Sequence, residues 1–186
     1  MTFAELSTPY STIVADPPWH RRTGPEQGVT RVGRQVRDRS ATAQYATLTN
    51  AEIRALPVCS VAAQDAHLYL WAPNLLLRDA FDVMEAWGFT YKTILTWCKT
   101  GHLGLGRHFR NQTEHVLFGV RGSLQTLDRG QVTYFTAAKG GHSVKPAAFG
   151  DLVERCSPGP YVELFARAPR LGWDSWGHGY EIGATA

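Results

Sequence analysis

The residues best suited to chemistry are an aspartate, two prolines and a tryptophan in the segment "VADPPW", residues 14–19. They follow the β-branched segment 11–15, which predicts a buried strand. Two consecutive prolines cannot continue the hydrogen bonding of that strand, so they need another explanation. If the strand lies inside an α/β sheet, its carboxyl end faces the crevice where such sheets bind ligands. Asp16 to Trp19 would then line a ligand site.

These four residues offer hydrogen-bond acceptors and a flat apolar face. The prolines have fixed φ angles, so the backbone carbonyls of residues 16–18 are held stiffly beside the carboxylate of Asp16. The exocyclic amine of a nucleobase has two N–H donors, and accepting both leaves its lone pair free to attack an electrophile. Trp19 offers a face on which an extruded base can stack. The alternative is a stiff turn in which Trp19 covers the core and Asp16 caps a neighbouring element.

Two basic segments could contact phosphate groups. One lies between His20 and Arg39 and contains Arg21, Arg22, Arg31, Arg34, Arg37 and Arg39. The other runs from Lys99 to Gln112, has no acidic residue, and contains Arg107 and Arg110. The net charge of +3 is too small to indicate nucleic-acid binding by itself. Taken alone, both segments are better explained as solvated loops.

Strands that alternate with helices predict an α/β sheet of the Rossmann-like type. We expect strands at 11–15, 67–72, 89–98, 114–120, 131–136 (an edge strand) and 161–168, and helices at 48–56, at 75–88 and from Pro146 to Cys156. Thr49 or Asn50 should cap the first helix, and Asn74 the second. The second helix should bury one face, made of Leu77, Phe81, Met84 and Trp87. The segment 16–44 is expected to be a long loop.

The length of 186 residues and the 44% of hydrophobic residues predict a single domain, residues 1–186. The chain has no apolar run long enough to cross a membrane and no secretory signal, so we expect a cytoplasmic protein without a membrane partner. The three cysteines are far apart and predict reduced, buried thiols. The histidines are scattered without a close pair, which disfavours a metal-dependent hydrolase.

The order of the motifs resembles the adenine-N(6) methyltransferase family that uses S-adenosylmethionine (SAM), typified by the catalytic subunit of the eukaryotic mRNA adenosine methyltransferase. The likeness covers nearly the whole chain, through "VADPPW", "YATLTNAEIRALPV", "HLYLWAPN", "AWGFTYKTILTWCKTG", "GRHFRNQTEHVLFGVRG", "SVKPAAFGDLVERCSPGPYVELFAR" and "GWDSWGH". It implies a mostly parallel, seven-stranded, Rossmann-like methyltransferase fold in permuted order. The catalytic motif comes first, and the strand equivalent to the SAM-binding motif, "YVELFAR", comes near the end.

The resemblance also assigns roles at the substrate side of the site. Asp16 and the Pro17 carbonyl would hold the adenine amine, with Pro18 completing the motif and Trp19 stacking nearby. Tyr45 matches a tyrosine on the adenine side. The remaining expected substrate contacts, to phosphates, are Arg21, Arg22, Arg107 and Arg110.

At the cofactor side, the resemblance places Asp16 close to the SAM amino group. Lys145 matches a lysine that reaches the SAM carboxylate or the base, and Phe165 and Arg167 match positions near the SAM adenosine. His178 stands where the family often has an asparagine that reaches the SAM ribose, so this contact departs from the family pattern.

The implied reaction is metal-free transfer of a methyl group from SAM to the 6-amino group of adenine in nucleic acid. DNA is favoured over RNA, with the base in a single strand or flipped out of a duplex. The protein would act as a monomer or homodimer, or with a partner subunit. Alternatives are a catalytically inactive, nucleic-acid-binding subunit and a cytosine 4-amino methyltransferase. The intact Asp16 and Trp19 favour an enzyme over the inactive subunit.

Overall fold

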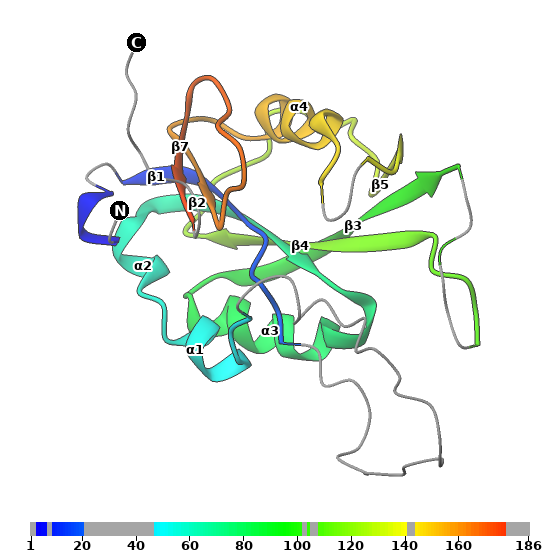
Figure 1. Cartoon of the computed structure of the whole chain (residues 1–186). Coiled ribbons are helices and arrows are strands. Elements are labelled where there is room, and N and C mark those ends of the chain that lie inside the picture. Colours follow the sequence, from blue (N-terminus) through cyan, green and yellow to red (C-terminus); the bar gives the residue numbers. More distant parts are fainter. Residues whose placement is uncertain are drawn as a thin grey trace, which may run out of the picture.

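The structure is a computed structural model of the chain, and it describes residues 3–6, 9–20, 47–101, 104, 108–140 and 144–177. These residues form a seven-stranded sheet with helices on both faces (Figure 1). The strands are β1 (Tyr10–Ala15), β2 (Ala62–Ala72), β3 (Thr90–Thr100), β4 (Thr113–Arg121), β5 (Tyr134–Ala138), β6 (Tyr161–Leu164) and β7 (Trp173–Trp176). The helices are α1 (Asn50–Arg54), α2 (Val58–Val61), α3 (Leu77–Ala86) and α4 (Ala147–Cys156), with short 3-10 segments η1 (Phe3–Glu5) and η3 (Asn74–Leu76).

The sheet has the strand order β5-β3-β4-β2-β1-β6-β7. β1 pairs in parallel with β2 on one side and with β6 on the other. Among the described strands, β4 alone runs against its neighbours, β2 and β3. The strand before the DPPW segment therefore lies inside the sheet, directly beside the strand "YVEL" from near the end of the chain. This arrangement confirms the expected Rossmann-like, mostly parallel methyltransferase fold in permuted order.

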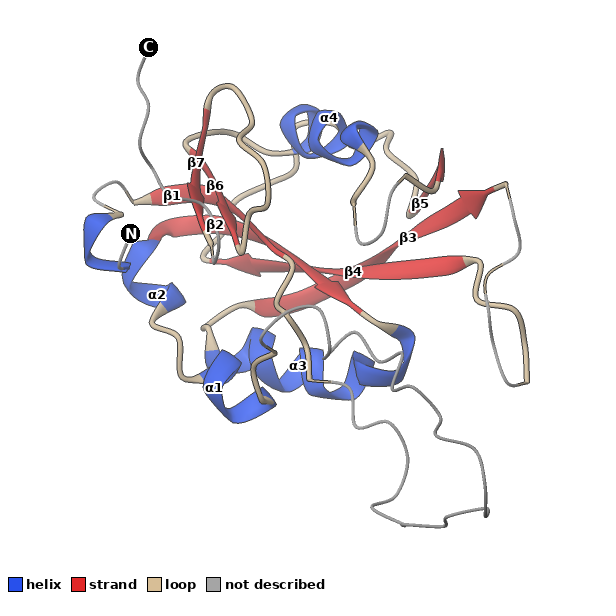
Figure 2. Cartoon of the chain, viewed as in Figure 1, coloured by secondary structure: helices blue, strands red, loops and turns tan. Residues whose placement is uncertain are grey.

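Two hydrophobic layers hold the helices on the sheet, with α1, α2 and α3 on one face and α4 on the other (Figure 2). Successive side chains of a strand point to opposite faces. In β1, Ile13 and Ala15 accordingly join the layer of α1 to α3, whereas Val14 joins the layer of α4. Burial on both faces explains why the inner strands are apolar almost throughout.

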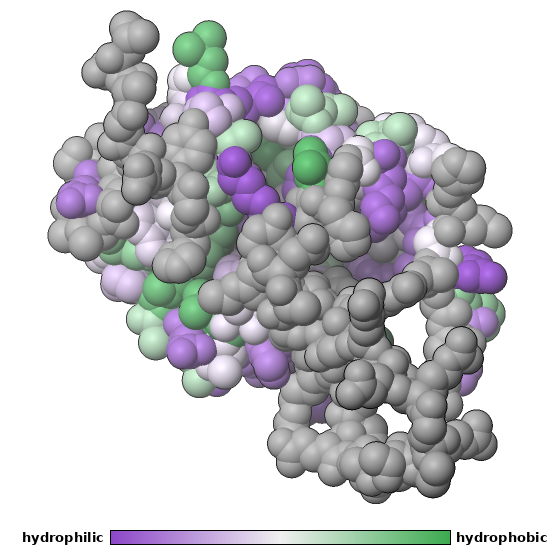
Figure 3. All heavy atoms as spheres, in the orientation of Figure 1, coloured by the Kyte–Doolittle hydropathy of each residue, from purple (hydrophilic) through white to green (hydrophobic). Residues whose placement is uncertain are grey.

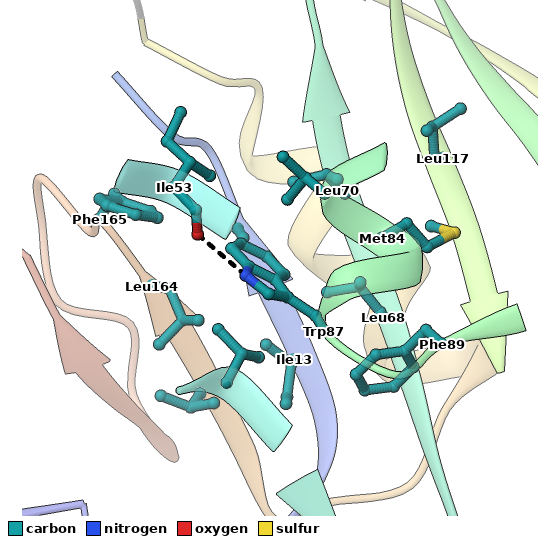
Figure 4. Close-up of a cluster of buried hydrophobic side chains, with 14 of the residues drawn as sticks. Ile13, Ile53, Leu68, Leu70, Met84, Trp87, Phe89, Leu117, Leu164 and Phe165 are labelled. Atoms are coloured by element: carbon teal, nitrogen blue, oxygen red, sulfur yellow. Dashed lines mark hydrogen bonds between the residues drawn. The ribbon is translucent and has the colours of Figure 1, made fainter. Parts of the chain in front are cut away.

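Trp87, at the end of α3, holds that helix against both the sheet and α1. Its indole is fully buried, and Nε1 donates a hydrogen bond of 3.0 Å to the carbonyl of Ile53 in α1. Figure 4 shows this bond within a cluster that includes Leu68 and Leu70 of β2. The bond satisfies the indole N–H, which would otherwise be costly to bury.

The amino ends of α1 and α3 test the two predicted caps. Thr49 caps α1 in a reciprocal capping box with Glu52, which confirms one of the two expected caps. The prediction that Asn74 caps the helix expected at 75–88 was wrong, because residues 74–76 form a 3-10 turn and α3 begins at Leu77.

The predicted buried face of α3 was partly wrong at Phe81. This side chain is 37% exposed and lies against Tyr91, with ring centres 4.9 Å apart. Ala80 and Val83 occupy the buried positions instead, next to Met84. Small side chains let the helix approach the sheet closely, so the large ring of Phe81 remains at the rim.

Near the end of the chain, the strand predicted over 161–168 stops at Leu164. Phe165 has a φ of +65°, a left-handed conformation that no strand residue adopts. The glycine-rich tail then supplies an unpredicted strand, β7, which pairs in parallel with β6 at the sheet edge. The strand expected at 131–136 is indeed at the opposite edge, shifted to Tyr134–Ala138.

Two further predictions concern the burial of the three cysteines and a membrane-spanning segment. Cys156 is buried and Cys98 half-buried, but Cys59 is exposed, so the expectation of three buried thiols was wrong for Cys59. No helix in the described part of the chain is long and apolar enough to cross a membrane.

Candidate active site

The candidate site lies at the sheet edge where the parallel strands have their carboxyl ends. Asp16 directly follows β1, and Phe165 directly follows β6. Because β4 runs in the opposite direction, its amino end with Glu114 reaches the same edge. Lys145 comes just before α4, which covers one face of the sheet. Four segments that are distant in sequence thus converge.

A chain of alternating charges connects these segments. The Nζ atom of Lys145 lies 3.0 Å from Oδ2 of Asp16 and 3.3 Å from Oε2 of Glu114. Lys99, near the end of β3, donates to the other Glu114 oxygen at 2.6 Å. Nη2 of Arg167 lies 4.0 Å from Oδ2 of Asp16. Two cations therefore approach the same oxygen of Asp16.

These contacts shift the protonation equilibria of the buried groups. Burial alone would raise the pKa of Glu114, but the charges and hydrogen bonds of Lys145 and Lys99 outweigh it and hold the pKa below its usual value. Burial alone would lower the pKa of Lys145, but Asp16 and Glu114 raise it above its usual value. Both groups are therefore charged near neutral pH, and the charge chain is intact.

Two buried tryptophans line the charge chain. The ammonium of Lys145 lies 4.7 Å from the ring centre of Trp71, and that of Lys99 lies 5.0 Å from the ring centre of Trp97. The two indoles meet edge to face at 6.1 Å. The rings attract the cations through their π faces and narrow the positions that the flexible lysines can take.

The DPPW segment is fixed by backbone contacts and by its tryptophan. The Pro17 carbonyl accepts from the Trp19 N–H at 2.8 Å, and the Pro18 carbonyl accepts from the Leu48 N–H at 2.9 Å. The Trp19 indole is 8% exposed, and its Nε1 donates to the carbonyl of Trp71 at 2.9 Å. Trp19 thus covers the core, as in the alternative drawn from the sequence. This burial leaves little of the ring for stacking, so stacking by Trp19 stays a prediction.

Beside Asp16, the end of β6 forms the other wall of the site. Phe165 is buried, packs edge to face on Trp176, and turns the chain sharply through its positive φ. Strained backbone of this kind concentrates at functional sites. Glu163 in β6 has a pKa above its usual value because of burial and the neighbouring charge of Asp16. In the space-filling view, hydrophilic and apolar residues surround a hollow on the face shown (Figure 3).

With this geometry in place, comparison with known sequences identifies the family. The sequence matches the MT-A70 family over residues 10–179. The chain belongs to the MT-A70 family. This agrees with the resemblance that the motifs indicate, including the order of the DPPW and "YVELFAR" segments.

Relatives of this MT-A70 chain are methyltransferases by name. It is 33% identical to the type II methyltransferase M.MunI of Mycoplasma sp, over 90% of this chain and 76% of that protein. It is 29% identical to the N(6)-adenosine-methyltransferase subunit METTL3 of Danio rerio, over 85% of this chain but 25% of that protein. It is 27% identical to the N6-methyladenosine RNA methyltransferase MTA1 of Cryphonectria parasitica, over 94% of this chain and 53% of that protein.

The predicted site residues of the MT-A70 chain divide into three groups. The structure brings Asp16, Lys145 and Arg167 together, with Phe165 and the DPPW residues Pro17, Pro18 and Trp19 beside them. Arg110 lies exposed in the segment before β4, and no contact described in the structure ties it to the site. The others lie outside the described residues: Arg21, Arg22, Tyr45, Arg107 and His178.

Sequence reasoning missed Glu114, Lys99, Trp71 and Glu163. The signal for Glu114 was available in part, because a carboxylate opens an otherwise apolar strand. Its partners depend on β4 being antiparallel, which sequence patterns did not reveal. Among the described residues, no three His, Cys, Asp or Glu side chains are grouped so that they could hold a metal ion.

Proposed function

We propose that this MT-A70 protein transfers a methyl group from SAM to the 6-amino group of adenine in nucleic acid. The observation that carries the proposal is the Asp16 carboxylate, at the carboxyl end of an inner strand, between the cations of Lys145 and Arg167. Ligands bind open α/β sheets at such strand ends. Membership of the MT-A70 family and the adenosine methyltransferases among its relatives support adenine as the base.

The groups around Asp16 fit the amino-acid end of SAM. That end has an ammonium and a carboxylate, and it needs an acceptor and a cation close together. Asp16 is the acceptor, and Lys145 or Arg167 is the cation. The ion pairs present in the structure keep these groups in place with their charges balanced. When bound, SAM supplies an electrophilic methyl group.

The acceptors of the DPPW segment would orient the adenine amine. Asp16 can accept one N–H, and the Pro17 carbonyl can accept another, because a carbonyl has two lone pairs and one serves the Trp19 N–H. Holding both N–H groups aims the nitrogen lone pair at the methyl group. The nitrogen would gain the methyl group as the sulfur–methyl bond of SAM breaks and S-adenosylhomocysteine leaves. The methylated nitrogen then releases a proton to solvent, so Asp16 need not be a strong base.

DNA is the substrate that we favour. The chain covers 76% of the type II methyltransferase M.MunI but 53% of the relative that is named for RNA. The exposed cation of Arg110 and the arginines of the DPPW-following segment would contact phosphates. The protein would act alone, as a homodimer or with a partner subunit.

An Asp16→Ala variant tests the proposal. We expect methyl transfer to fall at least about 100-fold, because one amine acceptor is lost. SAM should still bind through Lys145 and Arg167, but more weakly, because its ammonium loses the Asp16 acceptor. The assay uses labelled SAM with DNA and RNA oligonucleotides, followed by mass spectrometry of the nucleosides. The wild-type product should be N6-methyladenine.

A matched control is Asp82→Ala, at an exposed position of α3 on the opposite face of the sheet, which should keep wild-type turnover. Undiminished turnover in Asp16→Ala would overturn the role of Asp16. Methylation of cytosine instead of adenine would overturn the proposed base.

A further inference from the structure

We infer that Arg170 is a positioning residue that sets the distance between the two cation-bearing walls of the site. The inference deepens the proposed function and rests on it. One wall is the segment between β6 and β7, which carries Arg167. The other is α4, which begins two residues after Lys145, at Ala147. Both cations flank Asp16, at 4.0 Å and 3.0 Å.

Arg170 leaves the β6–β7 segment and binds the side of α4. Its Nε donates to Glu154 Oε1 at 2.8 Å, and its Nη2 donates to Glu154 Oε2 at 2.9 Å and to Asp151 Oδ1 at 2.7 Å. A guanidinium that engages both oxygens of a carboxylate is held in direction as well as in distance. The segment is therefore tied to the helix at a defined geometry.

Trp173 completes this connection from the start of β7. Its Nε1 donates to Glu154 Oε1 at 2.7 Å, and the Arg170 guanidinium lies 5.7 Å from its ring centre. Tyr161 of β6 stacks on the same ring at 4.9 Å with nearly parallel planes. Glu154 thus accepts hydrogen bonds from both Arg170 and Trp173. Because Trp173 stacks on Tyr161 of β6, the connection extends into the sheet.

The helix leaves room for the guanidinium at Gly150. A Cβ atom there would lie 2.5 Å from Nη1 and 2.6 Å from Cζ of Arg170. Glycine in a helix interior costs about 1 kcal/mol relative to alanine, so its presence needs a reason. The close approach of Arg170 provides one.

The side chain of Arg170 donates its hydrogen bonds to α4. It would therefore act on the site through the segment between β6 and β7, which also carries Arg167. If Arg170 releases α4, the Arg167 wall can move relative to Lys145. The positions of Arg167 and Lys145 around Asp16 are then no longer held relative to one another. The expected defect is in SAM binding, because Arg167 is one of the two cations proposed to meet the SAM carboxylate.

Three variants test whether Arg170 sets the position of Arg167 or only stabilises the fold. Arg170→Ala removes the connection, and Arg170→Lys keeps the charge but loses the fork geometry. Gly150→Ala leaves Arg170 in place and pushes its guanidinium off the carboxylates, while alanine favours the helix. We expect the dissociation constant for SAM, measured by calorimetry, to rise about tenfold in all three variants. In Gly150→Ala it should rise without a fall in melting temperature.

The matched control is Arg155→Ala, on the same helix, where the exposed arginine donates its side-chain hydrogen bond to Gln131 at 2.9 Å. It should bind SAM like the wild type. If Arg170→Ala and Gly150→Ala bind SAM within twofold of the wild type, Arg170 only braces the fold and the inference is overturned. Failure of the wild-type protein to bind SAM would instead overturn the proposed function.

Discussion

At the start of β4, Glu114 lies between the ammonium groups of Lys99 and Lys145, with contacts of 2.6 Å and 3.3 Å. Glu114 and Asp16 share Lys145, so the position of the lysine near Asp16 depends on both carboxylates. A lysine side chain has four rotatable bonds and no preferred direction of its own. The two carboxylates and the Trp71 ring together supply that direction.

A Glu114→Gln substitution should weaken this arrangement. Lys145 would lose one of its two charged partners, and a poorly paired, largely buried charge costs about 1–3 kcal/mol. We expect the free energy of unfolding, measured in urea, to fall by about that amount, and kcat/KM for methyl transfer to fall about tenfold. Glu85→Gln, at an exposed position of α3, is the control. Wild-type activity in Glu114→Gln would show that Lys145 needs Asp16 alone.

Residue by residue, the sequence was informative where a motif is contiguous. Asp16 and the prolines stand together, and their position after a strand places them correctly at the sheet edge. Lys145 and Arg167 followed from family resemblance and do lie beside Asp16. Glu114 could not be predicted, because its role depends on which strand lies beside which, and strand pairing is a long-range property.

Among the elements, α1 and α3 form a unit on the face opposite α4. Trp87 joins them through its hydrogen bond to Ile53, and both residues are fully buried. This contact packs α1 and α3 against the sheet and includes no residue of the charge chain. The unit therefore contributes to stability through packing, and it shares its hydrophobic layer with Ala15, Trp19 and Phe165 beside the site.

A Trp87→Phe substitution should destabilise the protein while leaving the site intact. It removes the indole hydrogen bond to the Ile53 carbonyl, which still accepts from the Leu56 N–H at 3.2 Å, and it removes buried ring volume. Together these losses cost about 1–3 kcal/mol. Urea unfolding should report this loss, while kcat/KM at 25 °C should remain near the wild-type value. Leu75→Ala, at a position that is 88% exposed, should change stability by less than about 0.5 kcal/mol and is the control. A large activity loss in Trp87→Phe would link this helix unit to the site.

The elements themselves were mostly foreseeable from local patterns. Alternating and continuous apolar runs located the strands, and the Thr49 cap located the start of α1. The end of β6 and the existence of β7 were not foreseeable. The left-handed turn at Phe165 has no glycine to announce it, and β7 gains its strand geometry by pairing with β6.

For the molecule as a whole, the buried His67 and the half-buried His115 should make stability depend on pH. His67 is fully buried in the sheet and hydrogen-bonded to Ser157 at 2.7 Å. Burial lowers its pKa from the ordinary value of 6.5, against a smaller opposing effect of the Leu124 carbonyl. His115, on β4, has a lowered pKa for the same main reason, opposed by Glu114.

The direction of the effect follows from proton binding. Below pH 6.5 the unfolded chain takes up protons that native His67 and His115 do not, so stability should fall as pH decreases from 6.5 towards the folded pKa values. Each histidine can contribute up to about 1.4 kcal/mol per pH unit in this window. The test is urea unfolding between about pH 5 and pH 7.5, with His67→Gln and His115→Gln each expected to flatten the slope. An unchanged slope in both variants would contradict the prediction.

The sequence by itself determined most of the strand and helix pattern, the DPPW segment and the family, because these depend on local order and on motifs that can be read along the chain. Tertiary structure alone decided that Glu114 and Trp71 join Asp16 and Lys145, and that Arg170 reaches α4. The physical reason is that these contacts depend on strand order, strand direction and the packing of α4. Those features arise from burial of the two hydrophobic layers over the whole sheet rather than from any one segment.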